Sequence, residues 1–233
     1  MAFTNPSIDV VIPAYNEEAS LPLVLEAIPS PPVSRTVVVD NNSTDATSEV
    51  AAAGGAQVVT ERRPGYGSAC LGGLDYLRRH EPAEIIVFLD ADFSDHPEEL
   101  PSLVAPILEG NFDLVIGSRL LGSREPGALL PQARAGNLIA CALIRGLYGH
   151  RFTDLGPFRA ITWTALESLE MSDPDFGWTA EMQVKALRRG LRVTEVPVSY
   201  RRRVGVSKIT GTLRGTLLAG YKILWTVLRY STA

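Results

Sequence analysis

The segment Phe88-Leu89-Asp90-Ala91-Asp92 constrains the fold of this chain more than any other feature. A short, uncharged apolar run over residues 85–89 ends abruptly in two carboxylates that are two residues apart. Such a run is typical of a strand that is buried on both faces of a parallel sheet. Because open α/β sheets bind ligands at the carboxyl ends of their strands, we expect the two carboxylates to lie at a ligand-binding edge.

Two carboxylates at such an edge are suited to a hard divalent cation. Mg²⁺ or Mn²⁺ is commonly held by one or two protein carboxylates, while water and substrate phosphate oxygens complete its shell. Asp90 and Asp92 therefore predict a Mg²⁺ or Mn²⁺ site that serves a phosphate-bearing substrate. Taken alone they are equally typical of an acidic turn that caps a helix, so the surrounding sequence must decide.

Short apolar runs alternate with helical patterns through the first half of the chain. We predict strands at residues 8–12, 36–39, 57–60, 85–89 and 114–116, and helices at 17–28, 45–53, 65–79 and 97–108. The second half predicts helices at 134–148, 178–189 and 207–230, strands within 152–161 and at 192–198, and a loop at 122–131. The alternation predicts an α/β fold with a mostly parallel central sheet and helices on both faces.

The chain is long enough for one large domain, and an apolar content of 45% can fill its core. Its two cysteines, Cys70 and Cys141, form no disulfide or metal-binding pattern. The N-terminus has no basic stretch followed by an apolar run, and no uncharged apolar stretch reaches about 18 residues. We therefore expect a cytoplasmic protein without a signal peptide or a membrane-spanning helix.

Charge is divided unevenly along the chain. Residues 1–184 contain 11 basic and 25 acidic side chains, whereas residues 185–233 contain 11 basic side chains and the single acid Glu195. A basic tail on an acidic body indicates a phosphate-rich partner, either a nucleotide or an anionic membrane surface. Nucleic acid is not expected as a partner, because the body is acidic and few aromatic residues are interleaved with the basic ones in the tail.

Polar clusters follow four of the predicted strands. They cover residues 13–17, 40–43, 90–92 and 117–119, and parallel strands would bring all four to one edge of the sheet. Turn and cap chemistry explains each cluster taken singly, and we favour that explanation for Asn42 and Ser43. The convergence of acids, amides and one arginine at a single edge indicates a binding site.

Four of these segments together resemble a known family. V-V-I-P-A-Y-N-E-E, V-V-V-D-N-N-S-T-D-A-T, F-L-D-A-D and V-I-G-S-R, in this order and spacing, are similar to family-2 glycosyltransferases of the GT-A fold. Residues 153–161, 177–182 and 205–208 resemble the branch that contains the dolichyl-phosphate mannose synthases and their bacterial relatives. The resemblance implies an inverting, single-displacement transfer of a sugar from a nucleotide-sugar donor.

The resemblance also implies a division of the chain and a set of site residues. Residues 1–120 would form the nucleotide-sugar-binding half, residues 121–206 the acceptor-side half of the same domain, and residues 207–233 a C-terminal amphipathic helix. Asp40 would accept a hydrogen bond from the base, and Asp90 and Asp92 would hold the metal. The nucleotide would contact Pro13, Tyr15, Glu17, Asp40, Arg62, Gly67, Asp90 and Ala91. The sugar and diphosphate would contact Asp92, Arg119, Arg203 and Lys208.

Two details of these motifs leave alternatives open. The synthases usually carry Gln two residues after the second Asp, where this chain has Ser94, so Asp95 or water would have to complete the metal shell. His96, before a proline, is better explained as a helix-start residue than as a metal ligand. The glycines around Gly67 permit a close approach of the nucleotide, and they would serve close helix packing equally well.

Glu181 is the predicted general base. A hydroxyl acceptor must lose its proton as it attacks, and a carboxylate near the sugar suits that step. Glu181 would equally be placed favourably at a helix N-terminus. Asp154 would orient the sugar, or else belong to a turn. If the acceptor were a lipid phosphate, no base would be needed and Glu181 would only position the acceptor.

The basic tail has two parts. We expect Arg203 and Lys208, beside Arg201 and Arg202, to become ordered as a lid only when the donor binds. The last predicted helix places apolar residues on one stripe and basic residues near another. Core packing, a homodimer, and peripheral contact with the inner face of a membrane each explain it, and we favour core or dimer packing. The apolar stripe contains Ile209, Leu213, Leu217, Leu224 and Leu228.

Three classes of function remain to be distinguished. We predict a metal-dependent transfer of a hexose, from a UDP-sugar rather than a GDP-sugar, to a small hydroxylated acceptor, with a polyprenyl phosphate as the alternative acceptor. A nucleotidyltransferase would require a glycine-rich, basic loop after the first strand, and residues 13–17 do not provide one. A non-catalytic protein would bind the nucleotide-sugar without turning it over.

Overall fold

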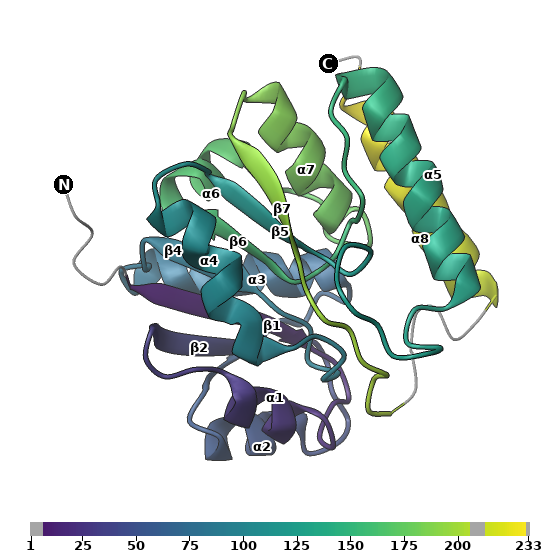
Figure 1. Cartoon of the computed structure of the whole chain (residues 1–233). Coiled ribbons are helices and arrows are strands. Elements are labelled where there is room, and N and C mark those ends of the chain that lie inside the picture. The colour runs from purple at the N-terminus through teal and green to yellow at the C-terminus, as the bar shows by residue number, and fades with distance from the viewer. Residues whose placement is uncertain (1–6, 206–212, 232–233) are drawn as a thin grey trace.

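We describe a computed structural model of the chain, covering residues 7–205 and 213–231 (Figure 1). Its centre is a seven-stranded sheet with the strand order β3-β2-β1-β4-β6-β5-β7. Every pairing is parallel except those of β6 with β4 and with β5. The strands are β1 (Ile8–Ala14), β2 (Val33–Asp40), β3 (Gln57–Thr60), β4 (Ile85–Phe88), β5 (Leu114–Ser118), β6 (Arg159–Thr162) and β7 (Val193–Pro197).

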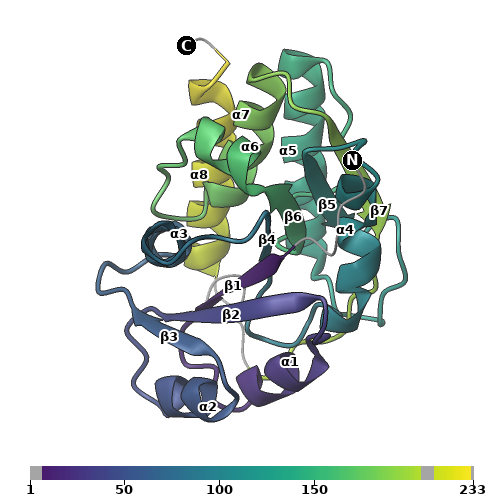
Figure 2. The same cartoon turned by 90° about the vertical axis from the view of Figure 1, so that its left-hand side faces the viewer.

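Helices cover both faces of this sheet (Figure 2). Alternate residues of a strand point to opposite faces, so Val11 packs on one side with α3 and α5 to α8, and Val10 on the other with α1, α2 and α4. The helices are α1 (Leu21–Ala27), α2 (Thr47–Ala53), α3 (Tyr66–Arg79), the short 3₁₀ turn η1 (Pro97–Glu99), α4 (Leu100–Leu108), α5 (Pro131–Tyr148), α6 (Trp163–Leu169), α7 (Trp178–Arg188) and α8 (Leu213–Arg229).

The prediction of an α/β fold with a mostly parallel central sheet is confirmed. Every predicted strand is present, although residues 152–158 are irregular and only Arg159–Thr162 forms a strand. Helix α6 was not predicted. Within the described part of the chain, no helix combines the length and apolar character needed to cross a bilayer.

The C-terminal helix packs against the core with part of its predicted stripe. Among the side chains that the structure describes in this helix, Thr226 and Val227 are buried, Leu224 is half-buried and packs against the core, and Leu228 is exposed. Ile209 lies outside the described residues, as do the side chains of Leu213 and Leu217. Among the side chains described in this helix, the large apolar ones that are exposed are Leu218, Tyr221, Trp225 and Leu228.

Candidate functional site

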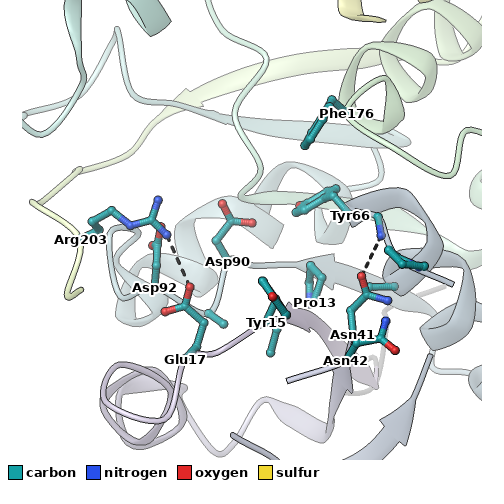
Figure 3. A pocket seen from close by; sticks show the side chains of 15 residues that line it. Pro13, Tyr15, Glu17, Asn41, Asn42, Tyr66, Asp90, Asp92, Phe176 and Arg203 are labelled. Atoms are coloured by element: carbon teal, nitrogen blue, oxygen red, sulfur yellow. Dashed lines mark hydrogen bonds and ion pairs between the residues drawn. The ribbon is translucent and has the colours of Figure 1, made fainter. Parts of the chain in front are cut away.

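A cavity of about 450 Å³ opens at the carboxyl ends of β1, β2 and β4 (Figure 3). The first half of the chain supplies most of its wall, and the second half adds Phe176, before α7, and Arg203, after β7. This is the sheet edge at which the sequence predicts a binding site. The lining residues are Pro13, Ala14, Tyr15, Glu17, Asn41, Asn42, Pro64, Gly65, Tyr66, Ala69, Asp90, Ala91, Asp92, Phe176 and Arg203.

Asp90 and Asp92 both face this cavity, immediately after β4. The Oδ1 atom of Asp90 is buried and has no hydrogen-bond partner among the described residues. Burial, together with the nearby charge of Asp92, raises the pKa of Asp90 to about 7. A carboxylate that is costly to ionise alone is stabilised by any cation placed against it.

Asp92 is oriented by hydrogen bonds within its own turn and forms an ion pair with Arg203. Its Oδ1 accepts hydrogen bonds from the Ser94 backbone N at 2.9 Å and from the Ser94 hydroxyl at 2.5 Å. Its Oδ2 lies 2.9 Å from Nη2 of Arg203, which also lies 3.5 Å from Oε1 of Glu17. Arg203 therefore forms its ion pairs with the protein itself, so its placement does not require the donor contacts of the predicted lid.

The residues at this point fit a divalent cation that retains most of its own water or phosphate ligands. Asp90 and Asp92 offer hard oxygen atoms, and one of these oxygens has no partner within the described chain. No group of three or more His, Cys, Asp or Glu side chains in the described ranges forms a ready cation cage. Mg²⁺ and Mn²⁺ are commonly bound by two carboxylates, with substrate oxygens in the remaining coordination positions.

Asp95 does not join Asp90 and Asp92 at the cavity wall. It is buried and does not line the cavity, and both of its carboxylate oxygens lack hydrogen-bond partners among the described residues. Burial, reinforced by the charges of Asp90 and Asp92, raises its pKa well above the usual range. His96 pairs with Glu98 at 2.8 Å at the start of η1, which agrees with a helix-start role.

The predicted nucleotide contacts fall into two groups. Pro13, Tyr15, Glu17, Asp90 and Ala91 line the cavity. The other three predicted contacts do not line it.

Asp40, Arg62 and Gly67 are not among the lining residues. The carboxylate of Asp40 accepts hydrogen bonds from Ser43 N at 2.9 Å and the Ser48 hydroxyl at 2.5 Å, so it organises its own loop and does not present itself to a base. A Cβ on Gly67 would lie 2.0 Å from the carbonyl oxygen of Asp173, which shows that close packing requires this glycine.

Sequence reasoning missed several residues that line the cavity. Asn41 lies at its wall, where its side chain bonds the backbone of Glu61, Arg63 and Gly65. Asn42, for which we favoured turn formation, lines the cavity as well. Their position after β2 was the available signal. Tyr66 lies between Gly65 and Gly67, in the segment whose glycines were expected to admit the nucleotide, whereas Phe176 lies before α7 and follows no strand end.

Glu181 is placed away from the cavity, contrary to its predicted role as general base. Its side chain is fully buried. Its carboxylate forms an ion pair with the Lys185 ammonium at 2.8 Å and accepts a hydrogen bond from the Tyr230 hydroxyl at 2.8 Å. It also accepts hydrogen bonds from Ser172 and from Asp173 N at 2.8 Å. Although burial opposes its charge, these partners leave the pKa of Glu181 below its usual value. This geometry is that of an anchor for residues 172–177, the segment that carries Phe176.

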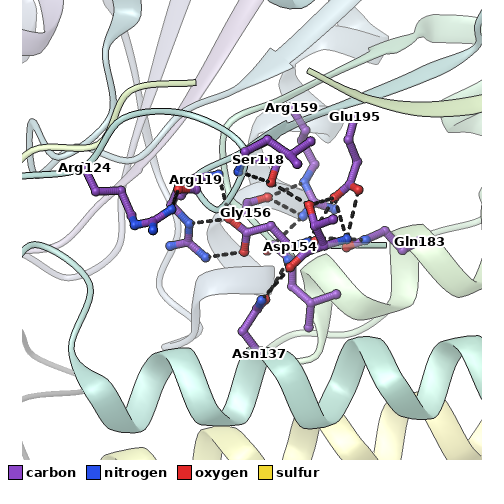
Figure 4. Close-up of polar contacts among 12 residues, drawn as sticks. Ser118, Arg119, Arg124, Asn137, Asp154, Gly156, Arg159, Gln183 and Glu195 are labelled. Carbon is purple, nitrogen blue, oxygen red and sulfur yellow. Dashed lines mark hydrogen bonds and ion pairs between the residues drawn. The ribbon is translucent and has the colours of Figure 1, made fainter. Parts of the chain in front are cut away.

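Arg119 and Asp154, both predicted near the sugar, bind each other (Figure 4). The guanidinium of Arg119 makes two contacts with the Asp154 carboxylate, at 2.8 and 2.7 Å, and the Arg119 backbone N donates a third at 2.9 Å. Asp154 is fully buried, and neither residue lines the cavity. The pair holds together the ends of β5 and the loop before β6, next to Glu195, which binds the backbone of Thr153 and Asp154.

Lys208, predicted to contact the diphosphate, lies outside the described residues. Of the basic cluster, Arg201 and Arg203 reach the loop after β4. Arg201 donates its backbone N to the Ser94 carbonyl at 2.9 Å and stacks 3.8 Å from the centre of the Phe93 ring. Arg202 instead binds Glu125 and Pro126 in the exposed loop before α5.

Comparisons with known proteins agree with this geometry. The chain is 43% identical over 216 residues to an uncharacterized glycosyltransferase of Mycobacterium tuberculosis, covering 91% of this chain and 94% of that protein. It is 32% identical to the undecaprenyl-phosphate mannosyltransferase of Micrococcus luteus, covering 88% of both chains.

A solved structure extends the comparison to the whole fold. The glucosyl-3-phosphoglycerate synthase of Mycobacterium tuberculosis, in complex with Mn²⁺, UDP and glucosyl-3-phosphoglycerate, superposes with a TM-score of 0.77 at 28% identity. The match covers 98% of this chain and 81% of that one. Another structure of the same synthase holds Mg²⁺ and UDP.

The model of glycosyl transferase family 2 matches residues 9–163, which is more than half of the chain and includes all four polar clusters. The resemblance seen in the sequence is thereby confirmed. The chain is an enzyme of the transferase class and belongs to glycosyltransferase family 2.

Proposed function

We propose that this enzyme transfers a hexose from a nucleoside-diphosphate sugar, a UDP-sugar in preference to a GDP-sugar, to a polyprenyl phosphate. The observation that carries the proposal is the pair Asp90 and Asp92 at the wall of a cavity large enough for a nucleotide. A divalent cation bound there would supply a positive charge against the departing nucleoside diphosphate.

The protein's own residues would divide the remaining work. Asp90 and Asp92 would hold the cation, and Ser94 would fix the orientation of Asp92. Pro13, Tyr15 and Glu17 would line the nucleotide, and Arg203 would bind its diphosphate by charge-assisted hydrogen bonds. Residues 1–120 would thus form most of the donor site, and residues 121–206 the acceptor side.

The choice of acceptor follows from the position of Glu181. Our expectation of a hydroxylated acceptor depended on a general base, and Glu181 is buried among five donors instead. Among the described residues that line the cavity, the carboxylates are Glu17, Asp90 and Asp92. Since a phosphate acceptor is already anionic, it needs no base, and this chemistry suits the site better.

A soluble acceptor is the second candidate, because the structural relative was crystallised with glucosyl-3-phosphoglycerate. The test supplies Mn²⁺ and radiolabelled UDP-hexose or GDP-hexose, with either undecaprenyl phosphate or phosphoglycerate as acceptor. We expect label in the organic phase with undecaprenyl phosphate. Label that appears only in an aqueous phosphoglycerate product would replace the lipid by the soluble acceptor.

A further inference from the structure

Helix α8 carries an apolar stripe on the side that faces away from the core. Leu218, Tyr221, Trp225 and Leu228 recur at intervals of three, four and three residues, which places them on one face of the helix. All four are exposed, Tyr221 to 68% and Trp225 to 50%. The opposite face is buried through Thr226 and Val227. The exposed apolar stripe is therefore separate from the face of α8 that packs on the domain.

Helix α5 lies beside α8 (Figure 1) and also carries exposed apolar residues. Its residues Leu138, Ile139 and Leu147 are exposed by 51%, 58% and 44%. The two helices are joined by the Tyr148 hydroxyl, which donates to the Val227 carbonyl at 2.7 Å. We call the exposed residues of the two helices the α5–α8 face. Its apolar members are Leu138, Ile139, Leu147, Leu218, Tyr221, Trp225 and Leu228.

The charges on these helices all have one sign. Neither Pro131–Tyr148 nor Leu213–Arg229 contains an Asp or a Glu. Arg134, Arg145 and Arg229 are exposed on them. Apolar residues with Tyr and Trp, bordered by basic side chains, are the composition of helices that lie in the interface of an anionic membrane.

We infer that the α5–α8 face docks on an anionic lipid surface. Charge favours lipid over a second copy of the chain, because a symmetric contact between two such faces would bring arginines of one copy against arginines of the other. The same charges would meet opposite charge on anionic headgroups, and each basic residue near such a surface adds to the binding.

The buried side of α8 connects this face to the cavity. Lys222 pairs with Asp173 at 3.1 Å, and the Tyr230 hydroxyl reaches Glu181 at 2.8 Å. Asp173 and Glu181 hold the segment that carries Phe176 into the cavity wall. A helix seated on lipid would therefore hold the cavity close to the headgroup region, where a polyprenyl phosphate presents its phosphate. The purpose of the docking rests on the proposed function, whereas the docking itself does not.

Vesicle flotation of the full chain tests the inference. The probes are vesicles of phosphatidylcholine alone and vesicles with about one third phosphatidylglycerol. We expect binding to the anionic vesicles at least about tenfold tighter than to the neutral ones, and weakened by salt. The fluorescence of Trp225 should shift to the blue on binding, and the shift should be absent in Trp225→Phe.

Two variants and one control locate the docking face. Tyr221→Ser with Trp225→Ser should weaken vesicle binding at least about tenfold, whereas Leu23→Ser, an exposed leucine of α1 on the other face of the sheet, should not. Changing Arg134, Arg145 and Arg229 to Gln should remove the preference for anionic vesicles. UDP binding without vesicles should persist in every variant, so failure of the docking and failure of the donor site are separate results.

Three results would overturn the inference. The first is binding of the same strength to neutral and to anionic vesicles. The second is a chain that binds UDP but no vesicles. The third is a concentration-dependent dimer, seen in sedimentation, that Trp225→Ser abolishes.

Discussion

Arg203 and Asp92 form an ion pair across the cavity wall, with Nη2 of the arginine 2.9 Å from Oδ2 of the aspartate. The two residues lie more than a hundred positions apart in the chain. The backbone also joins them, since Val204 N donates to the Asp92 carbonyl at 3.0 Å. A cation held by Asp90 and Asp92 would therefore have to share the Asp92 carboxylate with the Arg203 guanidinium.

Replacing Arg203 distinguishes the effect of this arginine from the effect of a bound metal ion. In Arg203→Gln, Asp92 loses its internal counter-ion, and we expect Mn²⁺ to bind several-fold more tightly in the absence of nucleotide. UDP in the presence of Mn²⁺ should bind about tenfold more weakly, because a charge-assisted hydrogen bond to the diphosphate is lost. Calorimetric titrations of Mn²⁺ alone and of UDP with Mn²⁺ measure both effects. Arg202→Gln, at a neighbour that binds the loop before α5, serves as the matched control.

Glu181 provides a second test, because its two candidate roles predict different kinetics. As an anchor, Glu181→Gln should lower the free energy of unfolding by about 1–3 kcal/mol and leave kcat of the folded enzyme within a few-fold. Loss of a general base would instead lower kcat by about 10²–10⁴. Denaturant unfolding and steady-state kinetics on the same preparation separate the two. A large loss of kcat with unchanged stability would restore the catalytic role.

The same carboxylate predicts a pH dependence of stability. Burial opposes its charge, but Lys185, Asp173 N and Tyr230 outweigh burial and hold the pKa of folded Glu181 below the usual 4.5. The folded state therefore binds fewer protons than the unfolded state near that pH, and the stabilisation is present above pH 4.5 and lost as pH falls through the folded pKa. The difference in unfolding free energy between wild type and Glu181→Gln should shrink between pH 6 and pH 3, and a constant difference would contradict this.

The Arg119–Asp154 pair should be important for stability. Asp154 is fully buried, so Asp154→Ala leaves the Arg119 guanidinium without its partner and should cost about 3–5 kcal/mol of unfolding free energy. Asp113–Arg192 is a suitable comparison, since it has similar geometry but an arginine that is 56% exposed. Asp113→Ala should cost much less than Asp154→Ala, because solvent screens an exposed pair. Thermal or denaturant unfolding measures both losses of stability. If Asp154→Ala and Asp113→Ala lost the same unfolding free energy, burial would not determine how much an ion pair contributes.

Gly67 tests the packing beneath the cavity. A Cβ there would lie 2.0 Å from the Asp173 carbonyl oxygen, so Gly67→Ala should destabilise the chain by about 1–3 kcal/mol and displace the segment that carries Phe176. In α5, a Cβ on Gly146 would meet nothing within 4 Å. Gly146→Ala should therefore stabilise the chain by up to about 1 kcal/mol, because alanine favours a helix over glycine. Thermal unfolding of both variants measures the contrast.

The fold could be predicted because its signals are local. Each parallel strand is a short run of apolar residues, and each ends at a polar cluster, so residues such as Pro13, Glu17, Asp90 and Asp92 could be placed at one sheet edge without coordinates. The antiparallel strand β6 was recognised only as a strand, because its partners β4 and β5 are set by tertiary packing.

The roles of single carboxylates could not be predicted in the same way. Asp40, Asp154 and Glu181 all occupy positions that suit a binding site, yet each is taken up by donors of the protein. Two of the deciding donors, Arg119 for Asp154 and Tyr230 for Glu181, lie 35 and 49 residues away. Spacing along the chain does not reveal such partners, whereas it does reveal which residues share a strand end.

The most direct test of the proposed donor site is a calorimetric titration with UDP and with GDP, each with and without Mn²⁺, of the wild type and of Asp92→Ala. We predict that UDP binds in preference to GDP, that binding requires Mn²⁺, and that Asp92→Ala abolishes the metal-dependent part while the variant remains folded. Equal UDP binding with and without Mn²⁺, unchanged in Asp92→Ala, would contradict a donor site built on Asp90 and Asp92.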